Sequence, residues 1–438
     1  MIELPEWSTA THSLAPISVD AQEHMTRTLG SRVGVSWLSD DRVRISSTSW
    51  VGTAQLTSGL HIRVAPKLAG DSLGVLTMLA ITDGAALQDM PEYFRGLSTV
   101  DVDDAVQLLC RLVVVHTERV LRRGLIRDYR SHAEDLPFLR GRLDGYRQAT
   151  KHYGKFTAIA CTYDEFDHDT MENHLLLAGV RTARRATADP RLRRRAAELE
   201  GRLLDIAPTL PSRRELLTDQ VVYGRRNAHY RTAHTWCRSL LRLGQAEDTD
   251  IPNAPRIETF LINMNALFER FVDWLVAQAL SEQPFDLQAQ KRNPSVIKVD
   301  GQTRRSIAPD LVVGHEQRRF AIDAKYKLYD GADISPSDTY QLLLYAQCYT
   351  GFTKVPTSYL IYPTSGSSSV QSTTELTVPR GVGPSESVRV IAIGIPLARI
   401  VAGLRSRDDA PRSEVLADLR RTLPALDANC ELAPRVTS

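Results

Sequence analysis

Residues 308–327 constrain the fold more than any other part of the chain, because they follow the pattern of a β-hairpin. Residues 311–313 are apolar, residues 314–317 suit a turn, and residues 319–327 alternate between polar and apolar side chains. The pattern predicts two short strands with one face in a core. Five side chains would point into that core: Leu311, Val313, Phe320, Ile322 and Ala324.

The other face of this hairpin would carry charge. If Gly314 pairs with Gln317, Asp310 lies opposite Ala321. Two further charged residues then share the face with Asp310: Asp323 and Lys325. One face is therefore predicted to carry functional side chains, and the other to pack in the core.

Two aspartates and a lysine on one face indicate phosphodiester cleavage. Carboxylates a few ångströms apart repel each other unless a cation lies between them, and carboxylate oxygens with water suit Mg²⁺ or Mn²⁺. Lys325 would lie beside a metal-bound water, where it could orient or deprotonate the nucleophile and offset charge on the phosphate. The alternative is a solvated cross-strand charge pattern, which is the commoner origin of an Asp-x-Lys triplet.

A strongly periodic segment precedes the hairpin. Residues 257–275 carry apolar side chains at helical spacing and predict an amphipathic helix. Glu269 falls at the edge of the apolar stripe. It either adds a third carboxylate to the metal site or simply faces solvent.

A second helix is predicted after the hairpin, over residues 335–347. Ser335 suits the N-cap position, and a proline follows it. Asp338, Gln341 and Tyr345 share one face at helical spacing. Two of them have structural alternatives, because Asp338 can complete a capping box and Tyr345 can pack in the core.

Taken together, these residues resemble the motif series of the PD-(D/E)XK nucleases, in the branch similar to RecB-type domains with a Gln-x-x-x-Tyr helix. More narrowly, residues 264–269 and 323–327 resemble the McrC family, the nuclease subunits of McrBC-type modified-cytosine-dependent restriction systems. Segments further upstream support the resemblance: 61–67, 139–144, 163–166 and 169–173. The resemblance implies an α/β fold class, with a C-terminal restriction-endonuclease-like domain that has a mixed sheet flanked by helices.

A role for each site residue follows from the resemblance. Asp310, Asp323 and the carbonyl of Ala324 would hold Mg²⁺ or Mn²⁺, and Glu269 would bind the ion through water or position a second ion. Lys325 would activate or orient the attacking water. Gln341 would steady the substrate backbone, and Tyr345 would support Gln341.

The chain divides into three expected parts. Residues 1–95 form a small β-rich module, residues 96–250 a mostly helical region, and residues 251–438 the nuclease domain, introduced by a proline-containing linker at 251–256. The resemblance implies that residues 1–95 bind a motor partner; the alternative is a plain β subdomain. Shorter elements are also predicted: strands over 32–38, 42–46, 60–64, 358–363 and 388–393, a strand-like segment near 156–163, and helices over 102–121, 172–186 and 411–424.

The densest basic stretch lies in the helical region. It runs from residue 181 to residue 195, and its arginines could neutralise DNA phosphates. Because no aromatic residues are interleaved with them, a solvated helix surface paired with Glu198 and Glu200 is the favoured alternative. The candidate DNA-binding residues are Arg184, Arg185, Arg191, Arg193, Arg194 and Arg195.

Composition fits a cytoplasmic enzyme. The chain has 438 residues and five scattered cysteines, a pattern that indicates neither a zinc site nor a disulfide framework. Its first residues lack the features of a signal peptide, and no apolar run suits a membrane span. A formal net charge of +2 gives no overall signature of DNA binding.

The sequence contains no G-x-x-x-x-G-K-[ST] motif, so we expect no nucleotide to be bound by this chain alone. The resemblance implies that a hexameric AAA+ GTPase similar to McrB supplies the motor and selects double-stranded, modified DNA. The chain would bind and stimulate that GTPase in anti-phage defence and make the cut. Two alternatives remain: a non-catalytic adaptor of the motor, or a PD-(D/E)XK nuclease of a different defence assembly.

Overall fold

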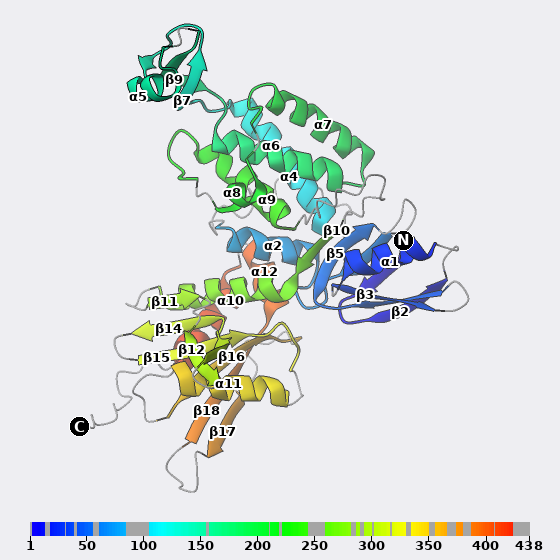
Figure 1. Cartoon of the computed structure of the whole chain (residues 1–438). Coiled ribbons are helices and arrows are strands. Elements are labelled where there is room, and N and C mark those ends of the chain that lie inside the picture. Colours follow the sequence, from blue (N-terminus) through cyan, green and yellow to red (C-terminus); the bar gives the residue numbers. More distant parts are fainter. Residues whose placement is uncertain are drawn as a thin grey trace, which may run out of the picture. The chain divides into compact units, whose positions relative to one another are not determined.

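The computed structural model of the chain divides into two compact units (Figure 1). Unit 1 comprises Met1–Pro91, Asp103–Ala105 and Asp250–Ser438, and unit 2 comprises Glu92–Val102 and Val106–Thr249. Unit 1 thus combines the N-terminal region with the part of the chain that follows residue 250. The structure describes residues 2–13, 18–30, 32–38, 42–55, 61–84, 105–154, 157–209, 211–218, 221–243, 259–281, 286–289, 293–299, 302–315, 318–329, 334–349, 355–365, 374–379, 387–406 and 408–423. The expected linker at 251–256 lies outside these residues.

Two small sheets and a helix form the N-terminal part of unit 1. A three-stranded sheet has the order β2 (Thr9–Ser13), β4 (Arg42–Ser47), β3 (Val33–Leu38), and helix α1 (Val19–Leu29) packs on β3. A four-stranded sheet has the order β1 (Ile2–Pro5), β6 (His61–Ala65), β5 (Trp50–Gln55), β10 (Thr259–Asn263). Alternating apolar side chains of both sheets share one core, which includes Leu261 of β10.

Strand β10 corrects the predicted helix over 257–275. Residues 259–263 pair antiparallel with β5, with Leu261 opposite Gly52, and the helix begins only at Met264. Their β-branched and aromatic side chains suit a strand, and the open edge of β5 gives that strand a partner. The side chain of Asn263 then caps helix α10 (Met264–Ala279) by accepting hydrogen bonds from the amides of Asn265 and Ala266.

A six-stranded mixed sheet forms the rest of unit 1. Its order is β11 (Asp286–Ala289), β14 (Leu311–His315), β15 (Arg318–Ala324), β16 (Thr357–Pro363), β18 (Ser387–Ile395), β17 (Thr374–Pro379). The three strands β15, β16 and β18 are parallel, and the outer pairs are antiparallel. The mixed α/β class expected from the sequence is therefore confirmed.

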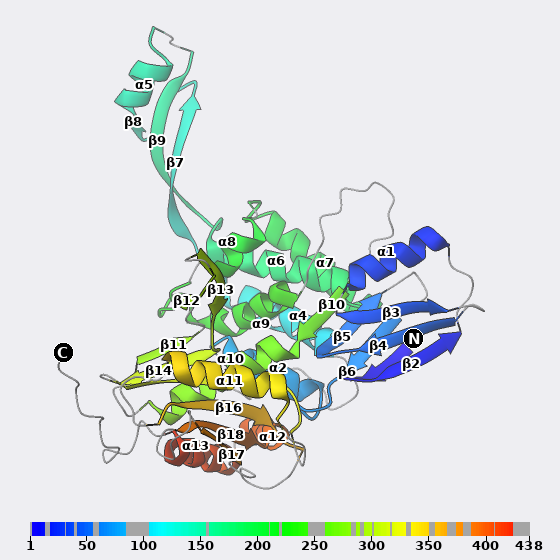
Figure 2. The same cartoon turned by 60° about the horizontal axis from the view of Figure 1, so that its bottom comes forward.

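Helices cover both faces of this sheet. Figure 2 shows α11 (Pro336–Tyr349) on one face and α12 (Leu397–Ser406) with α13 (Ala410–Thr422) on the other. Every residue of β16 is buried, as expected for a central strand covered on both sides. A separate ribbon of β12 (Asn293–Val299) and β13 (Gln302–Ile307) leads into β14, and α2 (Ser72–Thr82) packs against α10 and α12.

The described residues of unit 2 are mostly helical. Helices α4 (Ala105–Arg123), α6 (Met171–Ala186), α7 (Pro190–Leu204), α8 (Arg213–Thr218) and α9 (Arg231–Leu243) form its body. The strand-like segment near 156–163 belongs to β9 (Ile159–Asp167), which pairs with β7 (Asp128–Leu136) and the short β8 (Arg142–Leu143). Figure 2 shows β7 and β9 as an arm that projects from these helices and carries β8 and α5 (Gly145–Lys151) at its far end.

Within the part of the chain that the structure describes, no helix is both long enough and apolar enough to cross a membrane.

Candidate active site

The hairpin of β14 and β15 sets the positions of the two aspartates. Gly314 pairs with Arg319, so the predicted pairing of Gly314 with Gln317 is wrong by two residues. Because side chains alternate with a period of two, a shift of two keeps every residue on its predicted face. Asp310 comes to lie beside the end of β15, where its Oδ2 accepts a hydrogen bond of 2.7 Å from the amide of Ala324.

The face that carries the aspartates is more apolar than predicted. Five of its residues pack with α11 in one buried cluster: Val312, Ala321, Leu360, Val390 and Ala392. The opposite face is also buried, at the five positions expected to point into a core. Both faces are therefore structural, and the charged residues occupy only the end of the hairpin. This placement follows from α11, which covers the face that the sequence alone left open.

Asp323 and Lys325 form a close ion pair at the end of β15. The Nζ atom of Lys325 lies 2.8 Å from Oδ2 of Asp323, and Asp323 is only 1% exposed. The amide of Lys325 donates to the carbonyl of Ile361 at 3.0 Å, so its backbone stays against β16 although β15 has ended. The lysine side chain is thus held over the carboxylate that it neutralises.

Burial shifts the pKa values of both aspartates upward. Burial, with a smaller contribution from the charge of Glu269, raises the pKa of Asp310 to about 6. Burial and the charge of Asp310 raise the pKa of Asp323 to about 7. Burial alone would lower the pKa of Lys325, but the two aspartates outweigh it and raise that pKa. The lysine therefore stays charged while the carboxyl groups hold protons readily.

Glu269 lies on α10, which contacts β15. Its pKa is raised chiefly by burial and also by the charges of Asp323 and Asp273, while Lys325 opposes the shift. Glu269 is therefore part of the same electrostatic group and not a plain solvent-facing residue. Among the described residues, however, Glu269, Asp310 and Asp323 do not form a group whose ligand atoms all lie within 4.8 Å of one another.

Asp273 is a carboxylate of this region that the sequence analysis missed. It follows Glu269 by one helical turn on α10, and burial raises its pKa to about 6. Its spacing of four residues from Glu269 was the available signal, because residues i and i+4 share a helix face.

The N-terminus of α11 shows the predicted capping arrangement. The amide of Asp338 donates to Oγ of Ser335 at 3.2 Å, and the Oδ2 of Asp338 accepts from that hydroxyl at 2.7 Å. The same Oδ2 accepts from the hydroxyl of Tyr329 at 2.6 Å and from Nζ of Lys327 at 3.1 Å. Asp338 thus takes part in the cap, although its side chain accepts from the hydroxyl of Ser335 and not from the amide that a capping box uses, and it also anchors the segment that follows β15.

Gln341 and Tyr345 form a short chain of hydrogen bonds toward the first aspartate. Nε2 of Gln341 donates to the hydroxyl of Tyr345 at 2.6 Å, and that hydroxyl donates to the carbonyl of Ala308 at 2.9 Å. One turn later, Tyr349 donates to the carbonyl of Ile307 at 2.5 Å. Helix α11 thus fixes the backbone just before Asp310.

The donor set at the end of the hairpin suits a hard divalent cation. Burial raises the proton affinity of both Asp310 and Asp323, the charge of Asp310 raises that of Asp323 further, and a divalent ion relieves this unfavourable charge as a proton does. Glu269 is close enough to act on the electrostatics of both but lies outside a tight three-carboxylate cluster. The residues present therefore fit an ion held by two carboxylates and water.

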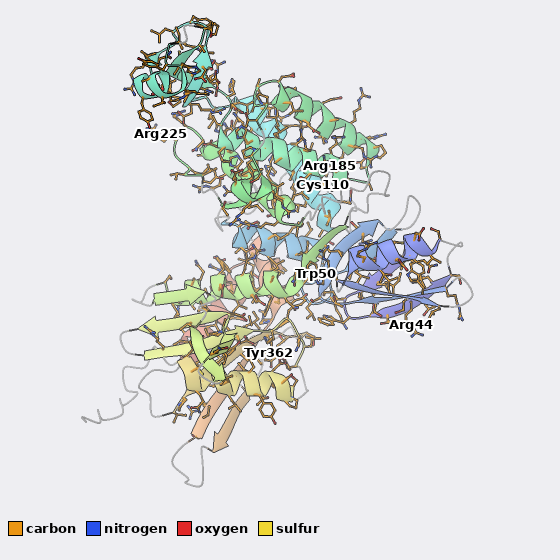
Figure 3. The ribbon with its side chains drawn as sticks, in the orientation of Figure 1. Arg44, Trp50, Cys110, Arg185, Arg225 and Tyr362 are labelled. Atoms are coloured by element: carbon orange, nitrogen blue, oxygen red, sulfur yellow. The ribbon has the colours of Figure 1, made fainter. Side chains whose placement is uncertain are left out.

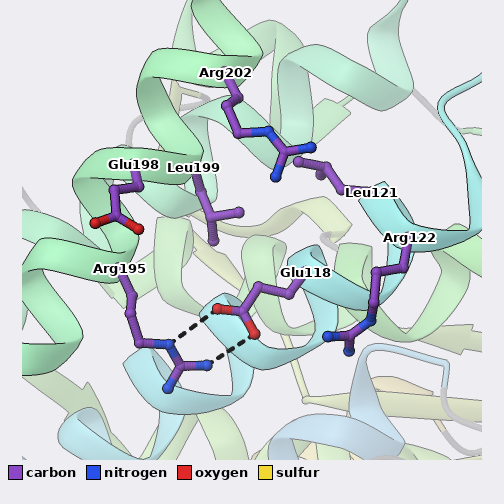
Figure 4. Close-up of a pocket in the computed structure, with 7 residues that line it drawn as sticks. All are labelled: Glu118, Leu121, Arg122, Arg195, Glu198, Leu199 and Arg202. Atoms are coloured by element: carbon purple, nitrogen blue, oxygen red, sulfur yellow. Dashed lines mark hydrogen bonds and ion pairs between the residues drawn. The ribbon is translucent and has the colours of Figure 1, made fainter.

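Most of the basic stretch in unit 2 is paired with acids. Both Arg181 and Arg184 bind Glu200, Arg194 binds Glu198 at 3.3 Å, and Arg193 donates to the carbonyl of Thr187. Arg195 makes two hydrogen bonds to Glu118, beside a groove of about 410 Å³ (Figure 4). Arg185 and Arg191 are exposed; Arg185 lies on α6 (Figure 3). This pairing matches the favoured alternative of a solvated helix surface.

A different carboxylate and histidine cluster lies on the arm of unit 2. Ligand atoms of His132, Glu165 and Asp167 lie within 4.8 Å of one another, the only such group among the described residues. Arg140 already pairs with Glu165 at 3.4 Å. The arginine would compete with a cation for this carboxylate, so the cluster is a weaker metal candidate than the aspartate pair.

Comparison with known families assigns the chain. Residues 45–363 match the model of a family described as McrBC 5-methylcytosine restriction system component. This match covers well over half of the chain, including the whole hairpin and α11. The chain belongs to this family. As an McrBC family member it is a component of a restriction system, and the resemblance found in its motifs is confirmed at this level.

One solved structure supports the fold of this McrBC family member. A half-complex from a tetradecameric assembly of Thermococcus gammatolerans McrB AAA+ hexamers with bound McrC contains a chain with a TM-score of 0.55 and 18% identity, covering 97% of this chain and 100% of that one. The Thermococcus gammatolerans McrBC complex gives a TM-score of 0.40 and 19% identity, over 64% of this chain and 88% of that one. No curated protein matches the chain.

Proposed function

We propose that this chain is the metal-dependent DNA endonuclease subunit of its restriction system and that its six-stranded sheet is a PD-(D/E)XK nuclease core. The observation that carries the proposal is the group at the end of the hairpin. Asp310 is fixed by the amide of Ala324, and Asp323 lies 2.8 Å from the ammonium of Lys325. Two neighbouring carboxylates, with a lysine directly after the second strand, can hydrolyse a phosphodiester when they bind a metal ion.

Each side chain has a distinct task in this proposal. Asp310 and Asp323, with the carbonyl of Ala324, hold Mg²⁺ or Mn²⁺, and Glu269 acts through water. The chemistry that this ion supplies when bound is charge neutralisation at the phosphate and a lowered pKa for a water ligand. Lys325 stays protonated beside Asp323, so it orients the water and stabilises negative charge on the phosphate.

Gln341 and Tyr345 position the first aspartate in this proposal. The resemblance had implied that Gln341 steadies the substrate backbone. Its hydrogen bond to Tyr345, and that of Tyr345 to the carbonyl of Ala308, favour a role in holding the segment that presents Asp310. The pair keeps this carboxylate aligned as the ion binds.

For targeting and energy we propose a partner, a hexameric AAA+ GTPase similar to McrB. A solved structure of similar fold, from Thermococcus gammatolerans, contains McrB AAA+ hexamers with bound McrC. The chain itself has no G-x-x-x-x-G-K-[ST] sequence. In this proposal the partner delivers double-stranded, modified DNA to the aspartate pair.

The test is cleavage of methylated and unmethylated DNA with Mg²⁺ and the GTPase partner, comparing the wild-type chain with Asp323→Ala and Lys325→Ala. We expect each variant to lose at least about 100-fold in cleavage rate, because charge stabilisation at the phosphate is lost. Stimulation of the partner's GTPase should stay at the wild-type level and serves as the control for folding and binding. Cleavage at the normal rate by either variant would refute the assignment.

A further inference from the structure

Glu6 is a buried acid that contacts Tyr326, the residue directly after Lys325. It directly follows β1 and is 1% exposed. Its Oε2 accepts hydrogen bonds from the hydroxyl of Tyr326 at 3.2 Å and from the amide of Lys67 at 2.7 Å. Because Tyr326 follows Lys325 directly, one residue connects the N-terminal part of unit 1 to the lysine of the site.

Tyr326 also connects Glu6 to the helix that carries Glu269. The tyrosine is 1% exposed, and its ring lies 5.7 Å from the ring of Phe268, the residue before Glu269 on α10. The position of this one ring therefore bears on both Lys325 and Glu269.

A purely structural contact would not need an acid at position 6. Oε1 of Glu6 has no hydrogen-bond partner within the described part of the chain, and burial raises the pKa of Glu6 to about 7. Burying a carboxyl group with an unsatisfied oxygen is unfavourable, and an apolar pair at positions 6 and 326 would fill the same space without this cost. The arrangement instead gives the tyrosine hydroxyl one fixed acceptor.

We propose that Glu6 is a positioning residue for the aspartate pair, acting through Tyr326 to hold the backbone at residues 324–326. This inference rests on the proposed endonuclease function. With the hydroxyl of Tyr326 fixed, the carbonyl of Ala324 and the side chain of Lys325 keep their orientation toward Asp323. Without it, the ring of Tyr326 keeps its packing against Phe268, but its hydroxyl loses the acceptor that fixes it.

The experiment compares Glu6→Ala, Tyr326→Phe and the double variant with the wild type, in the full chain. Glu6→Gln is the conservative variant, because its amide oxygen still accepts both hydrogen bonds. Glu3→Gln is the matched control, since Glu3 lies on the adjacent strand β1 but is 54% exposed and pairs with Arg63. Two quantities are measured: the affinity for Mn²⁺ alone, from the electron paramagnetic resonance of free Mn²⁺, and kcat and KM for DNA with the GTPase partner present.

We expect Glu6→Ala and Tyr326→Phe each to lower Mn²⁺ affinity and kcat about 10-fold, a typical loss when a group that supports metal ligands is removed. KM for DNA should be unchanged, and Glu6→Gln and Glu3→Gln should behave as the wild type. The double variant should lose no more than either single variant, because both changes break the same hydrogen bond. A loss that is additive, or confined to KM, overturns the inference.

The outcomes also separate this inference from the proposed function. If the wild-type chain cuts DNA and Glu6→Ala matches it in both Mn²⁺ affinity and kcat, the positioning role is wrong and the endonuclease stands. If the wild-type chain does not cut, the endonuclease proposal fails and Mn²⁺ affinity alone decides the role of Glu6. If Glu6→Ala does not fold, Tyr326→Phe decides, and wild-type values for that variant overturn the inference.

Discussion

At the scale of single residues, Asp323 shows most directly how burial and charge conflict in this molecule. It is almost completely enclosed, its pKa is raised to about 7, and its charge is balanced by one lysine. Such a carboxyl group binds a proton or a cation in preference to remaining ionised alone. The conflict makes the site sensitive to pH in a direction that can be derived.

Cleavage should rise with pH, because metal binding requires both aspartates to release their protons. Asp310 and Asp323 do so as the pH passes about 6 and about 7. The raised values also mean that protonation stabilises the metal-free fold below these pH values, and that this contribution is lost as the pH rises through them. We expect the half-maximal pH of cleavage to move lower as the Mg²⁺ concentration increases, since ion and proton compete.

The measurement is the initial cleavage rate between about pH 5.5 and 8 at several Mg²⁺ concentrations. A rate that does not change over this range, or a midpoint that is independent of Mg²⁺, would contradict the competition. Melting temperature of the metal-free chain over the same range gives an independent check, with a fall expected toward higher pH.

At the scale of elements, α6 and α9 approach each other unusually closely in unit 2. A Cβ atom built on Gly179 of α6 would lie 2.3 Å from Sγ of Cys237 on α9. Cys237 is completely buried and sits in the helix interior, so it has no room to move aside. The contact requires glycine at this position.

Gly179→Ala should therefore lower the free energy of unfolding by about 1 to 3 kcal/mol, the usual cost of overpacking a core. Gly201→Ala on α7 is the matched control, because nothing lies within 4 Å of its built Cβ. That change should stabilise by up to about 1 kcal/mol through helix propensity. Urea unfolding of both variants checks the pair, and equal stabilities would show that α6 and α9 are not packed this tightly.

The arm of unit 2 carries most of the exposed large apolar side chains among the described residues. Seven large side chains on it are exposed: Tyr129, Phe138, Leu139, Leu143, Tyr146, Tyr153 and Phe166. Clustered exposed aromatic residues are typical of a protein interaction surface. The arm is thus a second candidate, beside residues 1–95, for contact with the proposed GTPase.

Replacing Tyr146 and Tyr153, which are 80% and 87% exposed, with serine should weaken GTPase partner binding at least about 10-fold without changing the fold. Calorimetric titration measures the affinity, and Tyr340→Ser, an exposed tyrosine of α11, is the control. Should Trp7→Ser weaken binding while the two arm variants do not, the N-terminal module would be favoured as the contact.

At the scale of the whole molecule, local patterns in the sequence predicted local structure well. The alternation of polar and apolar residues predicted the hairpin and which side chains share each face. The cap at Ser335 was predicted from side-chain type alone. What the sequence did not reveal depends on partners distant in the chain. Residues 259–263 were predicted as helix because nothing in these five residues indicates that they pair with β5. The contact of Glu6 with Tyr326 is likewise not predictable from local pattern, because 320 positions separate the two residues.

The hairpin register illustrates the same limit at a finer level. The two-residue error did not change which side chains share a face, since alternation is insensitive to an even shift. It did change the residue opposite Asp310 from Ala321 to Asp323, when the register of the hairpin is extended by one pair, and this change places the two aspartates together.

Strand β10 has a consequence for the order in which the protein can be made. It supplies the edge of a sheet whose other three strands end by residue 65, so this sheet stays incomplete until about 260 residues have left the ribosome. Until then the edge of β5 is open, and open edges invite pairing with other chains. A fragment that ends before β10 would carry this edge permanently, so the N-terminal region is best produced together with the strand that closes it.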